Sequence, residues 1–432
     1  MVPFIKDITI NILMYRTRLW KAVRKYGIDL RIFLTIPSAF ITGSVGKTTT
    51  CRMLTSILAA NGKVVGLSTT QGVYLGKETI RSGDSANCQY ASQLLIDKRV
   101  QTVVFELARG GLIQQGVAFN GCDVGAVLNV YDNHLGLDGI KTREALADIK
   151  SLVIKSARKM AVINADDPLC LAMRDKSVAS ETCLVSIHSD NPSIRDHQKA
   201  KGFTAFLNNE KNPVIHFCRG DALIGKIAAT EIPATYNGLF RPALSNAMFA
   251  MAIAYGMGVE FKVIRDALSA FQSNAETNPG RMNVFEHLPF KVLLTLADGV
   301  RALEELGRYI ISLNHSGNKY LMFCSVGNRS NQFIKDMGKS VAGIFTHYIC
   351  CDYDDLRGRP PYEAASLLSE GLIEQGVGGE KITIASSHQN ALETALNKPS
   401  ANDLLVICSF ASDAAKREIL SRGNASTSNQ IH

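Results

Sequence analysis

The chain has 432 residues, of which 46% are apolar and 20% are charged, and its formal net charge is +8. This length predicts two or three domains with a sizeable core, and the composition is typical of a globular protein in water. No apolar run approaches the roughly 20 residues of a membrane helix, and the N-terminus lacks a secretory pattern, which excludes a membrane span and predicts a cytoplasmic protein. Ten cysteines without a C-x-x-C pair favour reduced, buried thiols.

Residues 1–38, ahead of the first predicted strand, form a basic N-terminal segment. Residues 1–40 hold seven Lys or Arg against Asp7 and Asp29, and 7 minus 2 gives a net charge of +5. Two interpretations stay open: a solvated helix face around residues 16–25, or a surface that attracts an acidic polymer, a partner or a lipid headgroup. No nucleic-acid-binding motif accompanies the charge, so we do not expect a nucleic-acid partner.

From residue 39 onward, short β-branched runs alternate with helical periodicity. Strands are predicted at 39–42, 63–68, 102–106, 124–130 and 160–164, and a helix at 47–60. This alternation predicts an α/β fold with a mostly parallel sheet flanked by helices. Patches at 203–207, 214–218 and 222–227 predict a small antiparallel excursion, and helices follow at 244–256 and 263–271. We interpret residues 39–278 as a P-loop central domain.

A polar segment with a Pro-Gly pair, residues 274–280, is the predicted linker. Beyond it, strands are predicted at 291–296, 320–325, 347–351, 381–385 and 403–408, again alternating with helices. The same alternation argument predicts a second α/β domain, Rossmann-like, over residues 279–432.

The strongest motif is the Gly-rich turn at residues 41–50, between a predicted strand and a predicted helix. Its phosphate-binding residues are Gly43, Ser44, Val45, Gly46, Lys47, Thr48 and Thr49. Glycines let backbone N–H groups converge on phosphate oxygens, Lys47 neutralises the β and γ phosphates, and the Thr48 hydroxyl can ligate Mg²⁺. Ile41 stands where a longer loop has its first glycine, so this is the shortened G-x-x-G-K-T form. We predict ATP binding with Mg²⁺.

Three more side chains are candidates for catalysis. Glu106 ends a buried strand and either holds a metal ion or is a solvated strand-end carboxylate. His134 follows another such strand and either faces the ligand crevice or is structural. Lys150 borders the apolar stripe of a helix that Thr142 can cap, so it is either a partly buried, reactive amine or a lysine that snorkels to the surface.

Together these motifs resemble the Mur ligase superfamily, in particular the C-terminal ligase half of cyanophycin synthetase. The matching phrases keep their order at residues 41–50, 83–84, 106–111, 122–125, 134–136, 164–168, 279–283 and 354–361. Such an ordered series is far more specific than the P-loop alone. The resemblance implies an ATP-dependent ligase that phosphorylates a substrate carboxylate and couples it to the amine of an amino acid.

The resemblance also implies roles for single residues. Thr48 and Glu106 hold one Mg²⁺ and His134 serves a second. Lys150 matches a lysine that many of these ligases carry in carbamylated form. The last matches concern the nucleotide: Asn246 meets the adenine, Arg281 reaches the nucleotide on closure, and Asp298 lies in a loop that ordinarily touches it.

Three departures from the family keep a second interpretation open. Asn133 replaces an aspartate before His134, and the loop at residues 295–299 is shorter by two residues. The large ATP-grasp half of cyanophycin synthetase has no counterpart in the 38 residues ahead of the match. We therefore do not expect the chain to make a two-amino-acid polymer unaided. Three alternatives remain open: a folate polyglutamylating ligase, a ligase that acts with a protein partner or a second copy of itself, and a nucleotide-binding homologue with a regulatory role. No Asn-Lys-x-Asp motif supports a GTPase.

Overall fold

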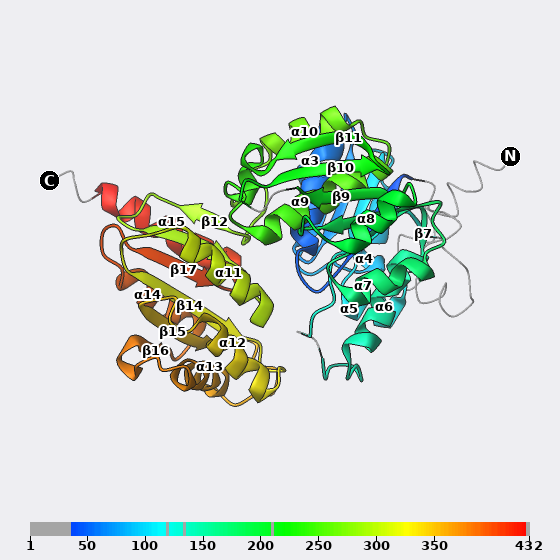
Figure 1. Ribbon diagram of the computed structural model, residues 1–432. Helices are drawn as coiled ribbons and strands as arrows, with labels where there is room; N and C mark the ends of the chain where they lie inside the picture. The colour runs from blue at the N-terminus through cyan, green and yellow to red at the C-terminus, as the bar shows by residue number, and fades with distance from the viewer. Residues whose placement is uncertain (1–35, 118–120, 133–134, 209–210, 429–432) are drawn as a thin grey trace. The chain divides into compact units, whose positions relative to one another are not determined.

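A computed structural model describes residues 36–117, 121–132, 135–208 and 211–428 of the chain (Figure 1). The basic segment up to residue 35 lies outside the described residues, as do Asn133 and His134. The described chain separates into two compact units. The first contains the chain up to Val130 together with Thr142–Phe271, and the second contains Tyr131–Lys141 together with the chain from Gln272 onward.

Within the described residues, the first unit holds a sheet of eleven strands in the order β11-β10-β9-β8-β7-β6-β1-β5-β2-β3-β4. Its strands are β1 (Ser38–Thr42), β2 (Val65–Thr69), β3 (Gly72–Leu75), β4 (Glu78–Ser82), β5 (Thr102–Glu106), β6 (Cys122–Val127), β7 (Ala157–Asn164), β8 (Glu181–Ser186), β9 (Phe203–Leu207), β10 (Val214–Arg219) and β11 (Ala222–Ala228). Neighbours from β2 through β9 pair in parallel, and antiparallel strands extend both edges. The predicted antiparallel excursion is thus a continuation of the main sheet.

Helices cover this sheet. The α-helices in the described part of the unit are α3 (Lys47–Ala60), α4 (Cys88–Ala91), α5 (Arg109–Gln115), α6 (Arg143–Lys155), α7 (Pro168–Leu171), α8 (Pro192–Lys199), α9 (Arg241–Gly256) and α10 (Phe261–Ala270). Successive residues of a strand point to opposite faces. In β1, Ile41 packs into the cluster formed with α3, α9 and α10, whereas Phe40 packs into the cluster that contains side chains of α4, α5 and α6. The parallel sheet is therefore buried on both faces.

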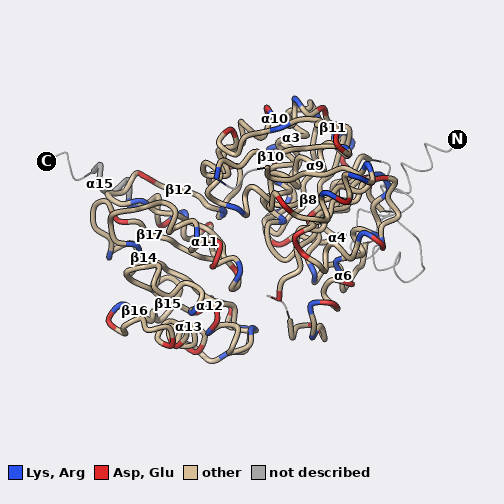
Figure 2. Tube along the Cα trace, viewed as in Figure 1, with Lys and Arg blue, Asp and Glu red and all other residues tan. Residues whose placement is uncertain are grey.

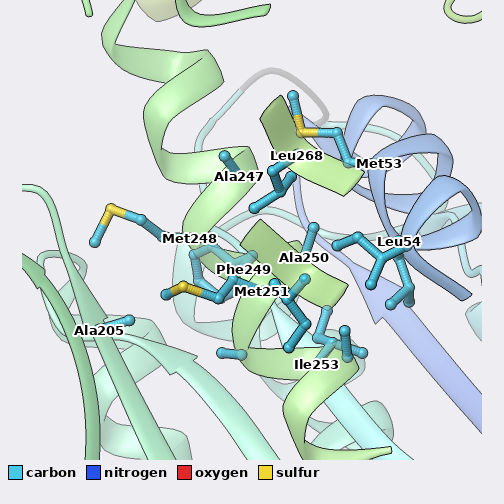
Figure 3. Close-up of a cluster of buried hydrophobic side chains, with 14 of the residues drawn as sticks. Met53, Leu54, Ala205, Ala247, Met248, Phe249, Ala250, Met251, Ile253 and Leu268 are labelled. Atoms are coloured by element: carbon cyan, nitrogen blue, oxygen red, sulfur yellow. The ribbon is translucent and has the colours of Figure 1, made fainter. Parts of the chain in front are cut away.

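The larger of these clusters is centred on α9, whose residues from Met248 to Ala254 are all buried. A helix that is apolar all round belongs in a core. Figure 3 shows Ala250 of α9 beside Leu54 of α3 and Met53 of α3 near Leu268 of α10, whereas Met248 and Met251 extend from α9 toward Ala205 of β9. This packing fixes α3, and with it the loop that precedes α3.

The second unit holds a six-stranded sheet in the order β12-β13-β17-β14-β15-β16 among the described residues. Its strands are β12 (Asn283–Phe285), β13 (Lys291–Thr295), β14 (Lys319–Ser325), β15 (His347–Asp352), β16 (Ile382–Ile384) and β17 (Leu404–Cys408), and its α-helices are α11 (Val300–Ser312), α12 (Asn331–Val341), α13 (Glu363–Glu374), α14 (His388–Asn397) and α15 (Ser412–Ser428). All pairs are parallel except β12–β13. The predicted α/β fold class is confirmed for both units.

Two further expectations concern the chain as a whole. All ten cysteines are free thiols and all are buried. No helix in the described part of the chain is both long and apolar enough to cross a membrane. Figure 2 shows Lys and Arg interspersed with Asp and Glu along the described chain of each unit.

Candidate active site

The predicted nucleotide site lies at the carboxyl ends of strands in the middle of the first unit's sheet. β1 pairs in parallel with β5 on one side and with β6 on the other, so the carboxyl ends of the three strands meet at the same edge. From β1 the chain passes outward to β2, returns to β5, and then crosses to β6, so the strand order reverses next to β1. Such a reversal is where open α/β sheets bind ligands. Gly43 follows β1, Glu106 ends β5 and Asn129 follows β6.

The loop that follows β1 needs its two glycines. Gly46 has a φ of 86°, which is left-handed, and a Cβ there would lie 2.4 Å from Asn246 Oδ1. A Cβ on Gly43 would lie 2.9 Å from Leu128 Cβ. Gly46 is also the N-cap of α3 and supplies no side-chain hydrogen bond to the first turn. The helix therefore begins with backbone N–H groups of the kind that bind phosphate.

A buried polar group stands beside this loop. The Thr48 hydroxyl donates a hydrogen bond to Glu106 Oε2 at 2.8 Å, and the Thr70 backbone N–H donates to the same oxygen at 3.3 Å. Glu106 is 1% exposed, and no Lys, Arg or His forms an ion pair with it within the described residues. Because a buried carboxylate without a counter-charge is costly, this oxygen set fits a divalent cation. The interpretation of Glu106 as a solvated strand end is wrong.

Lys47 and the predicted second metal ligand are placed differently. Lys47 Nζ donates a hydrogen bond to the backbone carbonyl of Ser44 at 3.1 Å, so it folds back over the loop. His134 lies outside the described residues. No group of three or more His, Cys, Asp and Glu side chains that could hold a metal ion occurs in the part of the chain that the structure describes. The structure thus brings together Lys47, Thr48 and Glu106 of the predicted catalytic and metal-binding residues.

Lys150 is the most deeply buried lysine of this region. It lies on α6, whose N-cap Thr142 accepts a hydrogen bond from Ala145 N, and it is 1% exposed. Burial lowers the pKa of its amine well below the ordinary value, and the positive charges of Lys47 and Arg109 lower it further. The interpretation of Lys150 as a snorkelling surface lysine is wrong. A buried amine of lowered pKa is reactive in its neutral form.

Replacing Lys150 by methionine should stabilise the fold and remove a pH dependence. The pKa of Lys150 is lowered in the folded chain and is near 10.4 in an unfolded chain. Between these two values the unfolded chain binds more protons, so the stability of the wild type rises with pH. In buffer free of CO₂, we expect Lys150→Met to have a larger free energy of unfolding than the wild type at pH 7, with the difference shrinking toward pH 10. Urea unfolding of both chains at several pH values measures this, and parallel curves would contradict the burial.

The predicted nucleotide contacts are divided between the two units. Asn246, on α9, accepts a hydrogen bond from the Thr50 hydroxyl at 3.3 Å and so lies against the phosphate loop. Arg281 belongs to the second unit, where its guanidinium donates to the Gly280 carbonyl at 3.1 Å. Asp298 is also in the second unit, and its role as a nucleotide contact, like that of Arg281, remains a prediction.

Asp298 forms a buried ion pair that the sequence analysis did not predict. Arg329 donates to Asp298 Oδ2 at 2.9 Å, and the two side chains are 4% and 18% exposed. The other oxygen, Asp298 Oδ1, is buried without a hydrogen-bond partner in the described chain. The two residues are 31 positions apart, so no local pattern links them.

Two residues next to the loop were also missed. Thr70, in the turn between β2 and β3, has its hydroxyl 3.2 Å from that of Thr48. Asn129 bonds to the loop backbone through its side chain. A usable signal existed for Asn129, because it lies at the carboxyl end of the strand predicted at 124–130, on the same side of the sheet as the loop.

Comparison with known proteins gives relatives for most of the chain. Residues 41–254 match the Mur ligase middle domain. The chain is 34% identical to the cyanophycin synthetase of Geminocystis herdmanii over 374 residues, which are 86% of this chain and 42% of that protein. It is 25% identical to a UDP-N-acetylmuramoyl-L-alanyl-D-glutamate--2,6-diaminopimelate ligase of Caldanaerobacter subterraneus over 378 residues, 85% of this chain and 71% of that ligase.

A solved structure shares the fold. E. coli FolC in complex with DHPP and ADP superposes with a TM-score of 0.67 at 18% identity, over 91% of each chain. By contrast, the chain spans only about two-fifths of the cyanophycin synthetases that it matches, which share 33–34% identity with it. The matched middle domain, and the similarity that continues through the second unit, show that the chain belongs to the Mur ligase superfamily.

Proposed function

We propose that this chain binds ATP with Mg²⁺ and joins an amine to a carboxylate through an acyl phosphate. The observation that carries the proposal is the hydrogen bond from the Thr48 hydroxyl to the buried carboxylate of Glu106, which has no ion-pair partner among the described residues, beside a glycine-lined phosphate loop. A hydrogen bond between threonine and glutamate that served only stability would not require a phosphate-binding loop beside it. A nucleotide with its metal ion uses all three features.

The residues of the first unit would divide the work. The N–H groups at the start of α3 and Lys47 would hold the phosphates, while the Thr48 hydroxyl and Glu106 would hold Mg²⁺. The bound metal neutralises charge on the transferring phosphoryl group. The substrate carboxylate attacks the γ-phosphorus and ADP leaves. The amine then attacks the acyl carbon, phosphate leaves, and the amine loses a proton to give the amide.

Carbamylation of Lys150 is part of this proposal. A neutral amine adds CO₂ and releases a proton, which leaves a negatively charged carbamate in place of the amine. The positive charges of Lys47 and Arg109, which disfavour the Lys150 ammonium, favour a negative carbamate at the same position. Added bicarbonate should therefore raise the free energy of unfolding of the wild type and leave Lys150→Met unchanged, and ¹³C-bicarbonate should give a carbamate resonance only in the wild type.

The proposed substrates are an acidic carboxylate compound and an amino acid, by analogy with the ligases that the chain resembles. A protein partner or a second copy of the chain that presents the carboxylate remains part of the proposal. The second candidate function is nucleotide binding without ligation, with a regulatory or scaffolding role. It is favoured by the shortened loop at residues 295–299, in which Asp298 is already paired with Arg329.

One assay separates the two functions. Phosphate release from ATP and Mg²⁺ is measured with acidic amino acids and peptides, each crossed with a panel of free amino acids. Release that a substrate pair stimulates, and that Lys47→Ala abolishes, supports ligation. The matched control is Lys63→Ala, because Lys63 is an exposed lysine of the same unit. Tight nucleotide binding with no release for any pair would instead support the regulatory function.

A further inference from the structure

Asn129 holds the phosphate loop through its side chain. Its Oδ1 accepts hydrogen bonds from the backbone N–H groups of Ser44 and Val45, both at 2.9 Å. Its Nδ2 donates to the Val45 carbonyl at 3.2 Å, and its own carbonyl accepts from Ser44 N at 3.0 Å. Asn129 is 9% exposed. Asn129, which follows the neighbouring strand β6, therefore bonds to the loop backbone at both the N–H and the carbonyl of Val45.

The segment that carries Asn129 is itself held in place. Asn164, at the end of β7, donates to the Leu128 carbonyl at 2.7 Å. Val130 N donates to Asp167 at 2.7 Å, and the Val130 carbonyl accepts from Arg143 at 2.8 Å. Because the residues on either side of it are bonded to three different elements, Asn129 is a rigid support.

The loop's backbone N–H groups are thereby divided into two sets. Those of Ser44 and Val45 bond to Asn129, whereas α3 begins at Lys47 without a side-chain cap. A glycine-containing loop loses much conformational entropy when it is ordered. A support that orders the loop in advance removes that cost from ligand binding.

We propose that Asn129 is a positioning residue for the nucleotide, which holds Ser44 and Val45 so that the N–H groups at the start of α3 face the triphosphate before it binds. This inference rests on the proposed function. It adds a residue that touches the loop backbone and acts on the nucleotide through it. Asn129 also lies on the segment that leads to residues 131–135, so it joins the phosphate loop to the stretch that contains the predicted ligand His134.

Two substitutions separate positioning from stability. Asn129→Ala loses all three side-chain bonds. Asn129→Asp keeps the two acceptor bonds, loses the Nδ2 donor, and adds a negative charge near the anion site. Asn164→Ala is the comparator, because it removes a support of the same segment without touching the loop. Mg-ADP affinity is measured by calorimetry, and hydrogen exchange of a peptide spanning residues 43–47 is measured without nucleotide.

We expect the loss of three hydrogen bonds to the loop backbone in Asn129→Ala to weaken Mg-ADP binding about tenfold and to speed exchange in the loop. Asn129→Asp should keep the exchange slow but bind Mg-ADP at least as weakly as Asn129→Ala, more so at low salt. Asn164→Ala should lower stability while keeping affinity within about twofold.

Other outcomes would overturn the inference. Affinity unchanged in Asn129→Ala, or tighter because phosphate competes with the asparagine for the same N–H groups, would contradict a positioning role. Equal exchange in the wild type and Asn129→Ala would show that the support is absent, whether or not nucleotide binds. A wild-type chain that binds no Mg-ADP or Mg-ATP would contradict the proposed function instead, and the exchange data would still decide whether Asn129 holds the loop.

Discussion

Glu106→Gln is expected to lower Mg²⁺-dependent ATP turnover about 100- to 1,000-fold while the chain stays folded. Glutamine can still accept the hydrogen bonds from Thr48 and Thr70, so the local packing is kept. It cannot supply the negative charge that a divalent cation needs, and losing one preorganised electrostatic contact at a phosphoryl-transfer site costs a factor of this size. Phosphate release measured against Mg²⁺ concentration tests this, with saturation shifted to higher metal concentration in the variant.

The stability of the same variant is informative. Glu106 is a buried carboxylate without a basic partner in the described chain, so neutralising it should leave the free energy of unfolding without metal equal or higher. Glu144→Gln is the matched control, because Glu144 is an exposed residue in the first turn of α6. Wild-type turnover in Glu106→Gln would refute the assignment of this carboxylate to the metal.

Gly46→Ala is expected to weaken ATP binding about 100-fold and to destabilise the first unit. The left-handed backbone at Gly46 costs a Cβ-bearing residue about 1–2 kcal/mol. The added Cβ would also lie 2.4 Å from Asn246 Oδ1, so the Asn246 side chain or the loop would have to shift. Shifts of this size near a phosphate site reduce binding and rate steeply. Equilibrium unfolding and nucleotide titration measure the two effects separately.

Gly62→Ala provides the control for backbone strain. Gly62 follows the other end of α3 with a φ of 76°, and a Cβ there would have no heavy atom within 4 Å. It should therefore lose about 1 kcal/mol of stability, as a left-handed residue at a helix C-terminus does, and bind nucleotide normally. If both alanine variants bound ATP equally well, the close approach of Asn246 to the loop would be unimportant for nucleotide binding.

Much of the fold follows from local patterns. α3 and β5 have the predicted bounds, because a Gly-rich turn marks one end of the helix and the strand is a continuous apolar run. β4 was missed, since all five of its residues are exposed and show no alternation. β8 was missed because it begins with polar residues, and its parallel pairing with β9 is a long-range contact that no local window contains.

The site was predictable to the extent that chemistry lies close together in sequence. The phosphate loop was found because its glycines, lysine and threonine are contiguous. The sequence alone could not decide whether Lys150 is buried, because a shift of one position along a helix moves a side chain from the buried face to its border with the exposed face. The support from Asn129 spans 84 residues to Val45, so it exists only in the folded chain.

The reactivity of the buried thiols described above reports local and global unfolding of the chain. Burial raises the pKa of Cys122 to about 12 and shields the sulfur from reagents in water, and the other nine cysteines are buried as well. An alkylating reagent at neutral pH can therefore attack these cysteines only in molecules that have unfolded locally or globally. Cys51 lies on α3, about one turn after Lys47, and Cys324 lies in the second unit's sheet, so mass-resolved labelling can follow the unfolding of each unit separately.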